Sequence, residues 1–549
     1  MLVIIALAPV AAFLWKSPAE VPMGDAYIHF VYARNLSEHG QLAFNLGMQE
    51  GIGTTSILWV LLLAGLNFVG VDPVTAARVL GAGLLMLEGQ IVFHLTLRVV
   101  AHMPPRARLG IALGAATVAV ASGNTVWMAL SGMETLLFLT LGLTALLFYE
   151  RRRFALAGIA LGLMALTRTE GLALAAVLGG LELYRRRKFG PWAIKLGLPI
   201  LVFFVPWLAF LQIRQGSPLP SSFQGKQAAM AAGSATFTDE HPEYTWLVSA
   251  SPMLHIASWI GYSVVYMTGA AAFPGPAFTF GGPVDPEQFV APYFGVGLSL
   301  ALLGGLILVA GRRLWRVRRT LTLQTTSWRL IIAVLLWNLA HNFMYAVLLP
   351  IPGAGGRYGP LNQLLIWLAA LAGALLLGQL RRVFAVAGLA GLIALSLGYW
   401  QTIYADNIDY NQRVRIPAAE YIEQHVPDGA AVGAVDLGPL RYYGNHETVD
   451  LFGFINNDIA QYRDDGGQYT DYLIERDLEY LLLFGPGDDG EPSVLNFGRR
   501  VGLYDDERFR PTTLEQFSIP TAEWLRGSGP VNNYLPAIEI VHVEFAPAR

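Results

Sequence analysis

The sequence places ionisable side chains at a few points between long apolar runs, and the first such point is the segment GDAYIHF at 24–30. A carboxylate such as Asp25 can take a proton from an attacking hydroxyl or help to hold a divalent cation. Alternatively, Asp25 is the N-cap of a helix over 26–37, because Asp is a favoured capping residue. Tyr27, His29 and Arg34 follow on the same segment. They are candidates for lining a groove, with no catalytic duty expected of His29.

Two further motifs, SGME at 131–134 and TRTEG at 167–171, stand where apolar runs begin or meet. Glu134 and Glu170 are therefore candidates for lining the same groove or organising its helices. Each motif also has a plainer explanation. Ser-x-x-Glu is a capping box, and Arg168 with Glu170 can form a simple ion pair in a surface turn. Asp25 and Glu134 are the two residues that could share a metal ion, so the sequence leaves a divalent cation open and requires no other cofactor.

Several other polar residues lie near the ends of apolar runs. Lys226 and Arg357 are suited to a phosphate group, Lys as a point charge and Arg through paired hydrogen bonds. They could equally extend to lipid headgroups. His341 and Asn342 fall within an apolar run, where polar side chains are either functional or interhelical hydrogen-bond partners. We expect these two to reach the groove.

The composition indicates which class of protein these motifs belong to. Of 549 residues, 54% are hydrophobic and only 14% are charged, whereas globular proteins carry about 25% charged residues. Residues 405–549 hold 25 acidic residues against 11 Arg, a net charge of −14, and residues 1–404 carry +11. The basic residues form scattered short clusters, which gives no support for nucleic-acid binding. With no Cys, disulfides and thiolate chemistry are excluded.

The apolar runs predict about eleven transmembrane helices, since a helix needs about 20 apolar residues to cross a bilayer. Five basic clusters hold 18 of the 26 Lys and Arg in residues 1–404, and the positive-inside rule places all five in the cytoplasm. One topology satisfies them: a cytoplasmic N-terminus, with 55–69 lying in the outer interface rather than crossing. The predicted spans are 2–15, 76–97, 109–129, 133–149, 154–167, 170–184, 191–213, 292–311, 330–350, 360–379 and 383–403.

This topology brings the polar motifs together. Asp25, Glu134, Arg168, Glu170, Lys226 and Arg357 all fall at the outer face. The convergence predicts a site in a groove at the outer leaflet. The first outer loop covers 16–75, with interfacial helices, and a long outer loop covers 214–291.

Beyond the membrane domain at 1–404, the pattern changes. Residues 415–426 indicate an amphipathic helix, and 430–436, 448–452 and 479–484 indicate short strands. We therefore expect 405–549 to be a small soluble α/β domain outside the membrane.

Five segments also carry a family resemblance. The stretch GDAYIHFVYARNLSEHGQLAFNLGMQEGIGTTSILW at 24–59 resembles the first periplasmic loop of GT-C-type membrane glycosyltransferases. Among these, it is similar to the mycobacterial terminal arabinofuranosyltransferases and related bacterial enzymes. SGMET at 131–135, LTRTEGL at 166–172, SPLPSSFQGK at 217–226 and GRYGP at 356–360 match further family motifs, the last resembling RY-x-x-P.

The resemblance implies a polytopic all-α enzyme of the cytoplasmic membrane. Such enzymes transfer a sugar from polyprenyl phosphate to an envelope glycan, glycolipid or protein, typically with inversion. It implies that Asp25 is the general base. It also implies that Arg357, Lys226 and Arg168, with Tyr358, hold the donor phosphate. The family often has two adjacent acids, but Gly24 replaces the first here. Together with Ile52 and Gly225, this departure means that the donor sugar need not be arabinofuranose, and that mannose, another pentose or a hexose is also compatible.

Two other functional classes fit the same composition. A transporter or flippase of lipid-linked sugars would need alternating access, usually between repeated halves, and the sequence shows no such repeat. A non-catalytic scaffold would bind envelope partners through 405–549.

Overall fold

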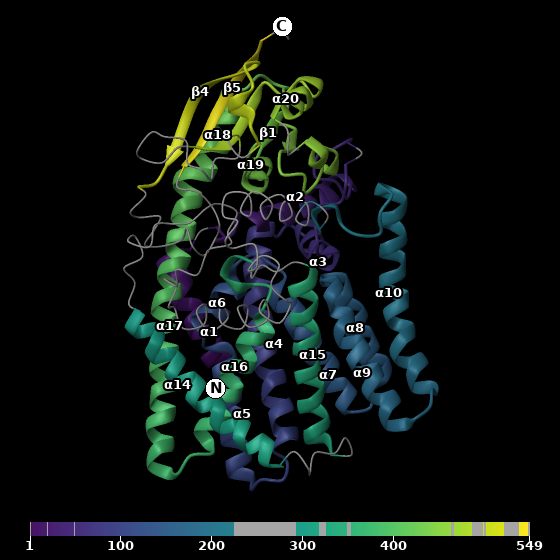
Figure 1. Cartoon of the computed structure of the whole chain (residues 1–549), viewed down its shortest axis with the longest axis vertical. Helices are drawn as coiled ribbons and strands as arrows, with labels where there is room; N and C mark the ends of the chain where they lie inside the picture. The colour runs from purple at the N-terminus through teal and green to yellow at the C-terminus, as the bar shows by residue number, and fades with distance from the viewer. Residues whose placement is uncertain are drawn as a thin grey trace, which may run out of the picture.

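The computed structural model describes residues 2–18, 20–48, 50–223, 225, 293–317, 325–348, 353–462, 466–485, 498, 501–520 and 537–546. Within these ranges, helices form a bundle and a β-sheet stands at one end of it (Figure 1). Most of the predicted outer loop 214–291 lies outside the described residues, and so does Lys226.

Each apolar run predicted to span the membrane coincides with one helix or with two consecutive helices. The run at 109–129 is the divided one, because α5 and α6 meet at an angle of 58°. The helices of this part are α1 (Leu2–Lys16), α2 (Gly24–His39), α3 (Ile57–Phe68), α4 (Pro73–Val99), α5 (Pro105–Val120), α6 (Gly123–Leu130), α7 (Thr135–Glu150), α8 (Phe154–Thr167), α9 (Leu172–Arg186), α10 (Pro191–Gln215), α14 (Tyr293–Val317), α15 (Thr326–Leu348), α16 (Pro360–Leu375) and α17 (Gln379–Tyr410).

Fewer of the described helices than predicted are long enough to cross a bilayer. Among the described residues, four helices are long and apolar enough to cross a bilayer, or five if the bent α5–α6 pair is one span. Shorter apolar helices such as α7 and α8 fall below that length. The count of about eleven spans therefore stays a prediction. So does the interfacial position of α3, whose 12 residues extend only about 18 Å.

Two capping interpretations made from the sequence are wrong. The N-cap of α2 is Met23, so Asp25 lies inside the first helical turn. Ser131 does not cap α7, whose N-cap is Glu134, with no side-chain capping bond. The Ser131 hydroxyl instead donates to the Met128 carbonyl. Asp25 and Glu134 are therefore not needed to start these helices.

Glycines allow close helix contacts in the bundle, as small residues do in membrane proteins. On α4, a Cβ at Gly81 would overlap the backbone of Ala129 on α6, whereas a Cβ at Gly83 would meet nothing within 4 Å. We expect Gly81→Ala to lower the free energy of unfolding by about 1–3 kcal/mol, because overpacking forces the two helices apart. Gly83→Ala should be neutral or slightly stabilising, because Ala has the higher helix propensity. Thermal unfolding in detergent compares the two, and equal effects would contradict the contact.

The described residues beyond 404 contain a five-stranded sheet of order β2-β1-β3-β5-β4. β1, β2 and β3 are parallel and coincide with predicted strands, whereas β4 and β5 are antiparallel and were not predicted. The extent of this domain and its place outside the membrane stay predictions. Its elements are α18 (Ile416–His425), β1 (Val432–Ala434), α19 (Leu437–Tyr443), β2 (Thr448–Asp450), α20 (Gly466–Glu475), β3 (Tyr480–Phe484), β4 (Phe509–Ser518) and β5 (Ala537–Phe545).

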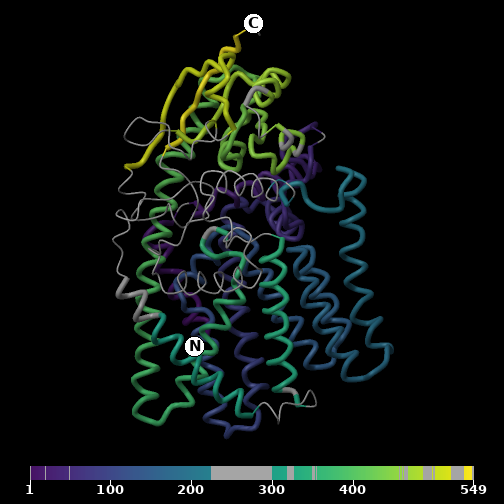
Figure 2. The backbone as a smooth tube through the Cα atoms, viewed as in Figure 1, coloured from purple at the N-terminus to yellow at the C-terminus, as the bar shows by residue number. Residues whose placement is uncertain are grey.

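An unbroken helical segment connects the bundle to the sheet region. The long helix α17 rises along the bundle and passes through a π-helical turn, Asn411–Arg415, into α18 (Figure 2). On the bundle side, α2 packs against α19. Tyr27 of α2 lies edge-on to Tyr442 with ring centroids 5.4 Å apart. The helix that carries Asp25 is thus held between the bundle and the C-terminal part.

Candidate active site

The N-terminus of α2 presents Asp25 to Arg357, which precedes α16. Arg357 Nη2 donates to Asp25 Oδ2 at 2.5 Å. The Asp25 side chain is 50% exposed and that of Arg357 only 7%. The first turn of a helix also favours a negative charge. The pair therefore joins a solvent-facing carboxylate to a buried cation.

A glycine-rich turn directs Arg357 toward α2. Gly353, Gly355 and Gly356 all have positive φ, between 62° and 72°, which glycine adopts without steric cost. Gly355 also packs so closely on the Trp127 ring that a Cβ would overlap it. Burial alone would lower the pKa of Arg357, but Tyr358 and Asp25 outweigh burial and raise this pKa above its ordinary value. Arg357 is therefore a permanent cation beneath Asp25.

A second charged group centres on Arg168, in the turn between α8 and α9. Its Nε donates to Glu170 Oε1 at 2.6 Å, and its Nη1 donates to Glu134 Oε1 at 3.2 Å. The remaining Nη2 bonds to the Tyr345 hydroxyl. That hydroxyl also donates to Glu170 Oε1 at 2.5 Å. Each guanidinium nitrogen of Arg168 thus has a partner, and the partners come from three separate segments. The plain Arg168–Glu170 pair is present but is part of a larger network.

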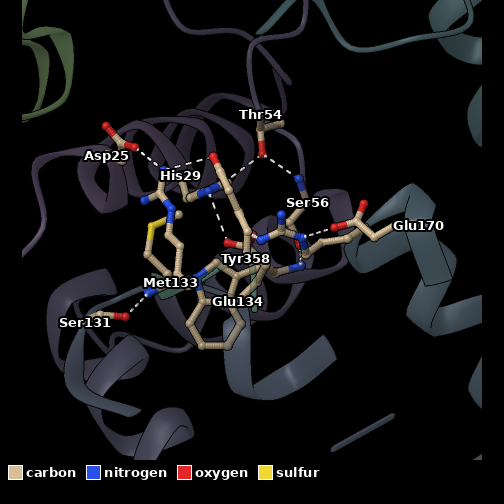
Figure 3. A network of polar contacts seen from close by, with 12 residues as sticks. Asp25, His29, Thr54, Ser56, Ser131, Met133, Glu134, Glu170 and Tyr358 are labelled. Atoms are coloured by element: carbon tan, nitrogen blue, oxygen red, sulfur yellow. Dashed lines mark hydrogen bonds and ion pairs between the residues drawn. The ribbon is translucent and has the colours of Figure 1, made fainter. Parts of the chain in front are cut away.

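His29 connects this network to α2. Its Nδ1 is 2.8 Å from Thr54 Oγ1, and its Nε2 is 3.6 Å from Glu134 Oε2 (Figure 3). Because Asp25 and His29 are four residues apart, they lie on the same face of the helix. One face of α2 therefore contacts both charged groups.

Tyr358 lies between the two arginines. Its ring centroid is 4.6 Å from the guanidinium carbon of Arg168 and 5.2 Å from that of Arg357. It also stacks on Tyr345 at 5.3 Å, and its carbonyl oxygen is 2.7 Å from His341 Nε2. We call Asp25, His29, Glu134, Arg168, Glu170, His341, Tyr345, Arg357 and Tyr358 the polar cluster.

Three predicted groove residues lie elsewhere among the described residues. The Tyr27 hydroxyl donates to Glu20 under the C-terminal part. Arg34 donates to the carbonyls of Arg441 and Tyr442 at the end of α19. Asn342 exchanges amide hydrogen bonds with Asn362 between α15 and α16. Tyr27 and Arg34 thus hold α2 to the C-terminal part, and Asn342 joins two helices.

The sequence interpretation missed two polar residues here, Thr54 and Tyr345. Thr54 falls inside the family-like stretch 24–59, so the resemblance could have indicated it. Tyr345 is four residues after His341 on α15, one helical turn away on the same face. This four-residue spacing from His341 could have identified Tyr345 as a residue of the site.

The carboxylates of the polar cluster do not form a metal site. Among the described residues, no group of three or more His, Asp or Glu side chains is placed to hold an ion. Asp25 and Glu134, the predicted pair, are each engaged by a different arginine. The side chains of the polar cluster, as far as the structure describes this part of the chain, therefore do not fit a divalent cation.

Sequence comparisons give one match, in the C-terminal part of the chain. A family model described as a domain of unknown function (DUF8728) matches residues 402–532. A search among curated proteins finds no significant sequence match.

Solved structures match the chain over nearly its whole length. ArnT from Cupriavidus metallidurans bound to undecaprenyl phosphate is 12% identical, with 100% of this chain and 99% of ArnT covered and a TM-score of 0.51. The oligosaccharyltransferase AglB from Archaeoglobus fulgidus, with an inhibitory peptide and a dolichol-phosphate, is 12% identical. The match covers 98% of this chain and 88% of the AglB chain, with a TM-score of 0.54. At this identity the matches show a shared fold. The resemblance inferred from the motifs is confirmed at that level: the chain has the fold of GT-C-type membrane glycosyltransferases.

Proposed function

We propose that the chain is a glycosyltransferase that moves a sugar from a polyprenyl-phosphate donor to an envelope glycan, glycolipid or protein. The reaction takes place at the outer face of the cytoplasmic membrane, with the N-terminus in the cytoplasm and 405–549 outside. Asp25 is the general base. The observation that carries the proposal is the half-exposed Asp25 carboxylate directly above the buried Arg357.

The proposed reaction is a single displacement. The acceptor hydroxyl attacks the anomeric carbon as its proton passes to Asp25. The bond from that carbon to the phosphate oxygen breaks, and polyprenyl phosphate leaves with the electron pair. Attack opposite the leaving group inverts the anomeric centre. The phosphate is already a good leaving group, so the protein mainly has to position the reactants and stabilise charge.

Donor binding would also activate the base. In the structure Asp25 accepts a hydrogen bond from Arg357. A carboxylate that is paired with a cation is a weaker base, because the cation stabilises its charged form. A phosphate competes well for arginine because it accepts paired, charge-assisted hydrogen bonds. A bound donor phosphate therefore competes for Arg357 and weakens its hydrogen bond to Asp25, which makes the carboxylate a stronger base.

The other members of the polar cluster support this pair. Each of the three guanidinium nitrogens of Arg168 already donates to Glu134, Glu170 or Tyr345, so we assign Arg168 to organising the polar cluster ahead of binding phosphate. Arg357, with Tyr358 beside it, is the leading phosphate ligand, and Lys226 is the further candidate outside the described residues. A divalent cation has no step in this mechanism.

Two of the structural relatives support the donor class. ArnT was solved bound to undecaprenyl phosphate, and AglB with a dolichol-phosphate and an inhibitory peptide. Both lipids are polyprenyl phosphates. The mycobacterial arabinofuranosyltransferase AftD also matches, with a TM-score of 0.38 over 99% of this chain and 41% of its own. That score carries no argument for arabinofuranose over mannose, another pentose or a hexose.

A donor screen tests the proposal. Purified protein in nanodiscs is given polyprenyl-phosphate-linked arabinofuranose, mannose, another pentose and another hexose, together with an envelope extract as acceptor, with and without EDTA. We expect transfer from one donor, unaffected by EDTA. In liposomes containing the same protein, movement of donor across the bilayer without a new glycosidic bond would favour a flippase. An envelope phenotype that requires only 405–549 would favour a scaffold.

We expect Arg357→Ala to raise the KM for the donor by about 10- to 100-fold, because a hydrogen bond to a charged group contributes about 1.5–3 kcal/mol. Arg357→Lys should recover part of this loss, since Lys keeps the charge but not the paired geometry. Initial rates at varied donor concentration measure the effect. An unchanged donor KM in Arg357→Ala would remove Arg357 from the phosphate site.

A further inference from the structure

An arginine from the C-terminal part lies directly on the first residue of α2. A Cβ built on Gly24 would be 2.9 Å from both the guanidinium carbon and Nη2 of Arg415, and 3.2 Å from its Nη1. The guanidinium plane therefore covers the Gly24 backbone. No larger residue fits at position 24 without displacing Arg415.

Arg415 is anchored by its own neighbours. Its Nε donates to Asp436 Oδ2 at 2.5 Å and its Nη1 to Asn411 Oδ1 at 2.9 Å. The ring of Tyr410 packs against it at 5.0 Å, and its side chain is only 8% exposed. A cation beside a helix N-terminus is electrostatically unfavourable. Asp436 and Asn411 thus help to hold Arg415 at this position, even though it lies beside the helix N-terminus.

Two more contacts hold the same end of α2. Asn411 Nδ2 donates to the Val21 carbonyl at 2.7 Å, just before the helix. Gly438, at the start of α19, packs on the Gly24 carbonyl so closely that a Cβ would overlap it. The C-terminal part thus fixes the backbone on which the next residue, Asp25, is carried.

We propose that Arg415 is a positioning residue of the active site, and that the C-terminal part holds Asp25 in place through the Arg415–Gly24 contact. This inference rests on the proposed function, in which Asp25 is the base. It accounts for the glycine at position 24, because the space that a side chain would occupy there is taken by the guanidinium of Arg415.

Steady-state kinetics provide the first test. Arg415→Ala, Arg415→Lys and Gly24→Ala should each lower kcat by about tenfold or more, with the donor KM unchanged. A displacement of about 1 Å at a reacting group can cost about 10²-fold in rate. The double variant Gly24→Ala/Arg415→Ala should be no slower than Arg415→Ala alone, because the added Cβ then has room. If loss of Arg415 unfolds the protein through the unpaired Asp436, Arg415→Lys and Gly24→Ala still decide the question.

Arg413→Ala is the matched control. Arg413 lies in the same π-helical turn and pairs with Asp409 at 2.9 Å, but its side chain is 44% exposed. It should keep the wild-type kcat. Wild-type kcat in both Arg415→Lys and Gly24→Ala would overturn the proposal.

A thiol probe separates this inference from the proposed function. The chain contains no Cys, so Asp25→Cys carries the only thiol. Its rate of reaction with a charged methanethiosulfonate reagent reports the placement of position 25. Adding Arg415→Lys or Gly24→Ala should change this rate, and adding Arg413→Ala should not. If the wild-type protein transfers no sugar, the proposed function fails. These rates then decide the positioning role alone, and equal rates in all backgrounds would contradict it.

Discussion

Asp25→Asn is expected to reduce kcat for glycosyl transfer by about 10²- to 10⁴-fold, the usual contribution of a general base. Asn has the same size but cannot take the acceptor proton. The fold should tolerate the change, because Asp25 is half exposed and the side-chain carbonyl of Asn can still accept the hydrogen bond from Arg357. Rates with saturating donor, together with thermal unfolding in detergent, separate the two effects.

Asp409→Asn is the control for this experiment. Its side chain is 46% exposed and also pairs with an arginine, but it lies outside the polar cluster. It should keep wild-type kcat. If Asp25→Asn also kept wild-type kcat, Asp25 would not be the base, and Glu134 and Glu170 would become the candidates.

Arg168→Met is expected to lower the free energy of unfolding by about 3–5 kcal/mol, the cost of breaking a buried ion pair by removing one partner. Glu134 and Glu170 would each lose the arginine that pairs with it. Their side chains are 2% and 13% exposed, so water cannot replace Arg168. Chemical or thermal unfolding in detergent measures the loss.

Two further variants make the Arg168 result specific. Arg186→Met removes an arginine from Glu182, which keeps Arg185 as a partner, so only a few tenths of a kcal/mol should be lost. Adding Glu134→Gln and Glu170→Gln to Arg168→Met should restore part of the stability, because the buried negative charges are gone. An Arg168→Met protein as stable as Arg186→Met would show that the network does not hold the site together.

The sequence predicts the helices of the bundle well because apolar runs of that length have few alternatives to a helix. The same reasoning identifies α3 as a short helix. β4 was missed because most of its side chains are exposed and its sequence, FRPTTLEQFS, shows no apolar alternation. β5 was overlooked although its sequence, AIEIVHVEF, is rich in the β-branched residues that favour strands. Its pairing with both β3 and β4 could not be predicted, because these partners are distant in the sequence.

The site was predicted only in outline. Asp25, Glu134, Arg168, Glu170 and Arg357 were expected at one face, and the structure brings them into one polar cluster. Their pairings were not predictable, because they depend on how α2, α7, α8, α15 and the turn at 353–356 pack together. Placing Tyr27 and Arg34 against the C-terminal part likewise required knowing that α19 lies against α2.

The most direct test of the account is product stoichiometry in a single turnover. Purified protein is mixed with a defined polyprenyl-phosphate sugar and acceptor, and both products are quantified by mass spectrometry. At the time when the wild-type turnover is complete, we expect equal amounts of free polyprenyl phosphate and glycosylated acceptor from the wild type, and only a small fraction of either from Asp25→Asn. Equal yields from both proteins at that time would contradict the role of Asp25, and wild-type protein that leaves the sugar on its lipid would contradict glycosyl transfer itself.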